Sequence, residues 1–141
     1  MPTSRLLIAA SVVVFLGAQA GFGRAEAACP VSDKPHKLKF KVQGDQCVTR
    51  VLKDKDGSDA ETIRVCEGDT VIWSVAGPRK SVVFTSGDTP FEWKNSEFKG
   101  NKIEGVVRQG AAKNGQSTSY KYTVKVEGKA CEHDPIIIVD R

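Results

Sequence analysis

Cys131 and His133, separated by one residue, have side chains well suited to binding a metal. A thiolate and an imidazole are good ligands for a soft ion such as Cu(I). Alternatively, Cys131 is oxidised in a disulfide and His133 is an exposed residue of a polar loop. An oxidising compartment would consume the thiol, so we expect the disulfide.

The chain has four cysteines, and an even number is typical of disulfides in an exported protein. Their spacing contains no C-x-x-C, which removes the usual support for a redox motif or a zinc ribbon. We therefore expect two disulfides, and the sequence leaves all three pairings open. The four residues are Cys29, Cys47, Cys66 and Cys131.

Other catalytic or ligand-binding patterns are weak. Residues 54–61 are rich in carboxylates, but an EF-hand calcium loop has its glycine at the sixth position, whereas Gly57 is the fourth residue here. A charged turn explains this segment better. The sequence has no Gly-x-Ser-x-Gly motif and no glycine-rich phosphate loop, and neither histidine has a local context typical of a general base. We expect a protein that is not an enzyme.

The N-terminus predicts export. Arg5 precedes the apolar residues 6–16, and Ala25-Glu26-Ala27 has the small-x-small form of a signal-peptidase site. The apolar run is shorter than the roughly 20 residues that a membrane-spanning helix needs, which argues against a retained anchor. We predict a signal peptide at residues 1–27, with cleavage after residues 18–20 as the alternative, and one domain at residues 28–141 in the periplasm or secreted.

Charge gives little information about the partner. Lys and Arg number 21 against 17 Asp and Glu, and the two signs alternate along the chain without a basic block. We therefore expect no nucleic acid and no membrane span after signal removal; the partner is an unknown protein or small ligand. Arg79, Lys80 and Lys129 are candidate anion-binding residues, with ordinary solvated side chains as the alternative.

Alternating hydrophobicity predicts an all-β protein. In residues 37–42 the apolar side chains alternate with lysines, and residues 70–75 and 120–126 repeat the period of two. Residues 81–84 and 136–139 are short β-branched runs. Glycine, proline, asparagine and aspartate separate these segments, so we predict seven to eight short strands in a two-sheet sandwich. Residues 91–102 are predicted to form an aromatic loop or a single helical turn.

Four of these segments together resemble the cupredoxin fold of plastocyanin and azurin. Residues 65–73 (VCEGDTVIW) are similar to its second hairpin, and residues 80–84 (KSVVF) to the strand that begins with a copper-binding histidine. Residues 119–122 and 136–139 are similar to its last two strands. The resemblance covers residues 36–140 and implies a Greek-key β-sandwich, as in a group of exported bacterial cupredoxin-like domains.

The family's copper ligands are largely missing. A type 1 site uses two imidazoles, one thiolate and a weak axial ligand, and the resemblance places Lys80 where the first histidine would be. The loop of residues 127–135 holds Cys131 and His133 without the family's spacing, and no methionine follows; the sole methionine is Met1. We expect an exported cupredoxin-like domain without a functional type 1 copper site or other cofactor, acting as a non-enzymatic binding protein of unknown ligand. The alternative is a periplasmic copper-binding electron carrier or metal chaperone using Cys131 and His133.

Overall fold

The computed structural model describes residues 28–93 and 95–141, which contain eleven β-strands and one short 3-10 helix, Lys113–Gly115. The predicted signal peptide lies outside the described residues. No helix of the described part is long and apolar enough to cross a membrane. The all-β prediction is confirmed.

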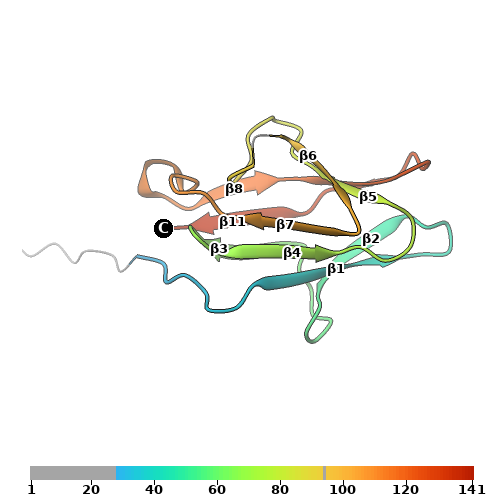
Figure 1. Cartoon of the computed structure of the whole chain (residues 1–141), viewed down its shortest axis with the longest axis horizontal. Coiled ribbons are helices and arrows are strands. Elements are labelled where there is room, and N and C mark those ends of the chain that lie inside the picture. The colour runs from blue at the N-terminus through green and yellow to red at the C-terminus, as the bar shows by residue number, and fades with distance from the viewer. Residues whose placement is uncertain (1–27, 94) are drawn as a thin grey trace, which may run out of the picture.

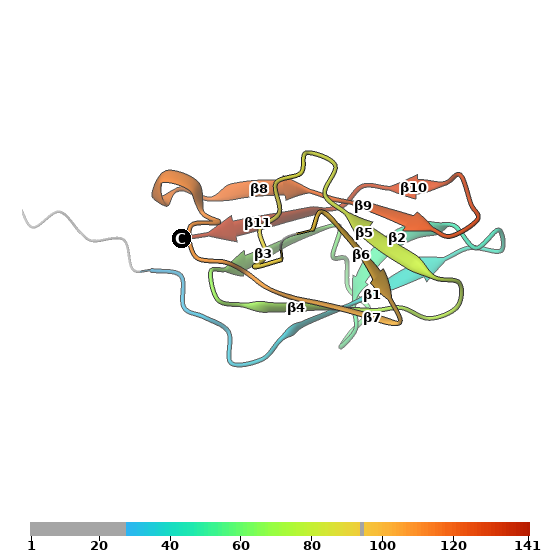
Figure 2. The same ribbon diagram turned by 45° about the horizontal axis from the view of Figure 1, so that its top comes forward.

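The strands form two layers (Figures 1 and 2). The first layer contains, in spatial order, β2 (Val48–Lys53), β1 (His36–Val42), β4 (Thr70–Ser74) and β7 (Lys102–Val106). The second layer consists of two sheets. One has the order β10 (Glu132–His133), β9 (Thr123–Val126), β5 (Lys80–Val83) and β6 (Glu97–Gly100), and the other has β3 (Thr62–Cys66), β11 (Ile136–Asp140) and β8 (Thr118–Lys121).

The two sheets of the second layer are continuous because β8 runs into β9 with only Tyr122 between them. β10 and β11 are likewise separated only by Asp134 and Pro135, since a proline cannot donate to the strand ladder. Compared with the sequence-based prediction, residues 120–126 are divided at Tyr122 and the strands β2, β6 and β10 are additional, which is why eleven strands form where seven to eight were predicted. β6 also replaces the helical turn considered for residues 91–102.

The pairing is mixed. β1 pairs in parallel with β4, and β3 pairs in parallel with β11, while the remaining pairs are antiparallel. Parallel strands need a crossover rather than a tight hairpin, and the chain accordingly changes layer after β2, β3, β4, β6 and β7. Each change of layer brings distant segments together at the ends of the sandwich.

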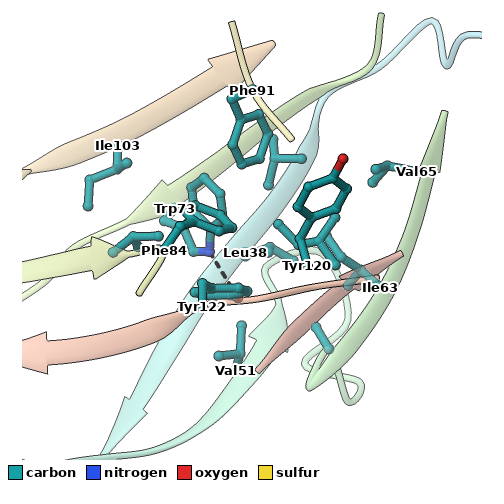
Figure 3. Close-up of a cluster of buried hydrophobic side chains, with 14 of the residues drawn as sticks. Leu38, Val51, Ile63, Val65, Trp73, Phe84, Phe91, Ile103, Tyr120 and Tyr122 are labelled. Carbon is teal, nitrogen blue, oxygen red and sulfur yellow. Dashed lines mark hydrogen bonds between the residues drawn. The ribbon is translucent and has the colours of Figure 1, made fainter. Parts of the chain in front are cut away.

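Trp73 of β4 lies at the centre of the core and is fully buried. Its indole N–H donates to the Tyr122 hydroxyl at 3.3 Å, which joins the two layers (Figure 3). The ring makes edge-to-face contacts with Phe91 and Tyr122, at centroid distances of 5.6 and 5.7 Å. Such geometry places a positive ring edge against a negative ring face. Burial raises the pKa of Tyr122, so the hydroxyl stays protonated.

Two disulfides fasten the sandwich. Cys47, which precedes β2 in the first layer, is bonded to Cys131, which precedes β10 in the second. Cys29 is bonded to Cys66 at the end of β3, and this bond holds the segment before β1. The expected two disulfides are confirmed, and the structure decides their pairing.

We predict that removing the bond with the larger sequence separation costs more stability. The separations are 84 residues for Cys47–Cys131 and 37 for Cys29–Cys66, and the loop-entropy model gives about 4.5 and about 4 kcal/mol respectively. Urea unfolding of the two paired Cys→Ala variants measures the order. Thiol titration of unfolded, unreduced protein should detect no reactive group; two or more would show that at least one of the two disulfides is absent.

Gly105 of β7 gives a second stability prediction. A Cβ at this position would lie 2.5 Å from Trp93 Cζ2 and 2.7 Å from Phe91 Cδ1. Gly105→Ala should therefore lower the free energy of unfolding by about 1–3 kcal/mol, the usual cost of overpacking. Gly44→Ala is the matched control in urea unfolding, because a Cβ added there would meet no described atom within 4 Å beyond its chain neighbours. Equal stabilities of the two variants would refute the argument.

Candidate functional site

Lys80, the residue at the expected copper-ligand position, begins β5 and is only 2% exposed. Its Nζ donates to the carbonyl oxygens of Ala76 at 2.6 Å and Pro78 at 3.0 Å. Burial lowers the pKa of Lys80. The amine donates both of these hydrogen bonds to the β4–β5 loop. The two hydrogen bonds fix the β4–β5 loop, which leads to the position where the resemblance expects a copper-binding histidine.

Cys131 and His133 are engaged elsewhere. The Cys131 sulfur is bonded to Cys47, so it offers no thiolate. His133 Nε2 lies 2.7 Å from Glu61 Oε2, and the other carboxylate oxygen of Glu61 accepts the Val51 N–H at 2.7 Å. The pair therefore links β10 to β2 across the two layers.

The described ranges, residues 28–93 and 95–141, contain no group of three or more His, Cys, Asp or Glu side chains able to hold a metal ion. Neither the acidic turn at residues 54–61 nor the Cys131–His133 loop forms such a group.

The candidate anion-binding residues do come together. Arg79, Lys80 and Lys129 line one hollow of about 340 Å³, and the Glu127 N–H donates to the Arg79 carbonyl at 2.9 Å. Arg79 and Lys129 are exposed, whereas Lys80 is buried. Glu97 and Glu127 also line this hollow, so its charge is mixed. Anion binding here stays a prediction, and Arg79 and Lys129 are the residues placed to carry it.

A buried carboxylate network was not found by sequence analysis. Asp69 is 2% exposed and accepts hydrogen bonds from the Ser32 N–H at 2.6 Å and the Cys66 N–H at 2.9 Å. His36 Nε2 lies 2.8 Å from its Oδ2. Burial opposes ionisation, yet the bonds from Cys66, Ser32 and His36 outweigh it and lower the pKa of Asp69. The local sequence indicated only a Gly-Asp turn, because two of the three partners lie more than thirty positions away.

A larger groove, of about 860 Å³, runs between the start of β1, the β2–β3 connection and β3. We call it the β1–β3 groove. It is lined by residues 34–38, 53–55 and 62–64 and by Asp59. Leu38 and Ile63 are its buried apolar residues, and lysines lie on its rim. It has the size typical of a ligand site.

A scan against protein-family models matched no family, and a search of curated proteins found no significant relative of the chain.

Replacing Asp69 tests the buried network. Asp69→Asn removes the charge that the two N–H groups and His36 face, and should cost about 1–3 kcal/mol. Because the pKa of Asp69 is lowered from 3.8, its contribution is complete above that pH and is lost as the pH falls through the lower folded-state pKa. Urea unfolding of both proteins at several pH values should show the difference shrinking in acid; a difference that grows there would contradict it.

Proposed function

We propose that the chain is an exported cupredoxin-like domain without a functional type 1 copper site, which acts by binding a ligand rather than by catalysis. One observation carries this proposal. Where the resemblance expects an imidazole and a thiolate, Lys80 donates to two carbonyl oxygens and Cys131 is disulfide-bonded. A type 1 site requires an imidazole nitrogen and a thiolate sulfur, and these two side chains supply neither.

The strand arrangement supports the cupredoxin-like part of the proposal. Each segment that carries the resemblance contains a strand, in the expected order: β3 and β4 for residues 65–73, β5 for the Lys80 strand, β8 for the penultimate strand and β11 for the last. β3 and β4 do not form the expected hairpin, because they pair with different strands and lie in different sheets. The chain also passes repeatedly between the two layers, so each layer is built from segments spread along the sequence, as in sandwiches with Greek-key connections. Function, however, depends on the site and not on the fold.

Export to the periplasm or beyond the cell is part of the proposal. Both disulfides are typical of an oxidising, extracellular-type environment. Binding rather than catalysis is supported by the β1–β3 groove, which combines a buried apolar floor with a basic rim.

Copper titration tests this proposal. Folded, oxidised protein mixed with Cu(II) should show no intense thiolate-to-copper absorption, because both cysteine pairs are oxidised. Lys80→His should not create the band, since His133 is held by Glu61 and Cys131 remains in its disulfide. Cys47→Ser is the informative companion variant, because it frees the Cys131 thiol without changing Lys80.

An intense blue band with one bound copper in the unsubstituted, oxidised protein would overturn the proposal in favour of the electron carrier. Stoichiometric Cu(I) retained by that same protein on dialysis would favour the metal chaperone.

A further inference from the structure

The β1–β3 groove has an unpaired strand edge along one wall. Among the described strands, β3 is the end strand of its sheet and pairs only with β11. The Glu61 carbonyl accepts the Ile136 N–H at 2.8 Å, just before β3 begins. Since alternate residues of a strand face opposite neighbours, the backbone groups of Thr62 and Arg64 point away from β11.

Cys66 supports this assignment of the outer edge. It is two residues beyond Arg64, and its N–H donates to the Asp69 carboxylate rather than to β11. The outward backbone groups of Thr62 and Arg64 therefore lie at the wall of the groove, where a further strand would find donors and acceptors.

The rim of the groove is positively charged. Its two aspartates already form ion pairs: the Asp59 carboxylate lies 3.0 Å from the Arg50 guanidinium, and the Asp54 carboxylate lies 4.0 Å from the Lys39 ammonium. Within the described residues, four exposed lysines of the groove form no ion pair. They are Lys34, Lys37, Lys53 and Lys55.

We propose that the β1–β3 groove binds an extended acidic segment of a partner protein, which pairs as an added strand with the outer edge of β3. Main-chain hydrogen bonds to Thr62 and Arg64 supply the pairing. Because strand side chains alternate, carboxylates at every second position face the four lysines. This inference rests on the proposed binding function and specifies its partner class and surface.

A defined peptide is the direct probe. We would use an end-capped peptide of about eight residues, long enough to match a typical strand, in which Glu and Thr alternate. It should bind the folded protein in isothermal titration calorimetry, and the affinity should fall as salt screens the lysines. Amide NMR shifts should centre on residues 62–64. Absence of binding at low salt would overturn the proposal.

Two altered peptides separate strand pairing from charge. Methylation of the backbone nitrogens that would face β3 keeps the carboxylates but removes the donors, so affinity should fall at least about tenfold. A Lys/Thr peptide of the same length should not bind. Equal affinity of the methylated peptide would exclude strand addition.

A charge-matched pair of protein variants locates the site. Lys37→Glu with Lys53→Glu should weaken peptide binding about tenfold or more, because both side chains line the groove. Lys41→Glu with Lys102→Glu makes the same change in net charge at exposed positions outside it, and should alter affinity less than about twofold. Equal losses would mean unspecific attraction to a basic protein. None of these peptide experiments involves copper. If the peptide does not bind, the copper titration still tests whether a type 1 site is absent.

Discussion

The indole of Trp73 occupies the middle of the sandwich, and its N–H donates to the Tyr122 hydroxyl across the two layers. A buried indole N–H without an acceptor would cost about 1–3 kcal/mol, so the two layers are held at the separation this bond allows. Tyr122 is also the residue at which β8 passes into β9. The same contact therefore joins the layers and sits at the junction between the two sheets of the second layer.

The same packing also determines which side chains are buried at the ends of the sandwich. β5 follows β4 through a short loop, and Lys80 at the start of β5 is drawn into the interior with the strand. A buried amine is costly unless its N–H groups find acceptors, and the carbonyl oxygens of Ala76 and Pro78 supply two. The loop in turn gains a fixed conformation. Lys80 is thus a structural element of this end of the sandwich.

The β1–β3 groove has a related origin. The chain leaves β2 in the first layer and enters β3 in the second, so the edge of β3 is not covered by the strand that precedes it. Open edges invite pairing with other chains, and lysines at such edges discourage unselective pairing. The four unpaired lysines therefore repel basic strands, and pairing with an uncharged strand would remove water from their ammonium groups without an opposite charge in return. An acidic strand supplies that opposite charge.

Local patterns were sufficient for much of the fold. Alternation along residues 37–42, 70–75 and 120–126 reflects a two-residue period that any half-buried strand must show, so the strands were predictable without knowledge of their neighbours. The even number of cysteines likewise predicted two disulfides. The turn at Pro135 was predicted, but the break at Tyr122 and the strands β2, β6 and β10 were missed, because these three segments are short and rich in polar residues.

What the sequence by itself determined about this protein is therefore its strand-forming segments, its turns, its all-β class and the types of side chain present at each candidate site. Only the tertiary structure decided that Cys131 is bonded to Cys47, that Lys80 is buried, and that Asp69 and His36 meet. It also decided which strand edge remains open. The physical reason is that these features join residues tens of positions apart, and their proximity depends on how the two layers pack rather than on any local propensity.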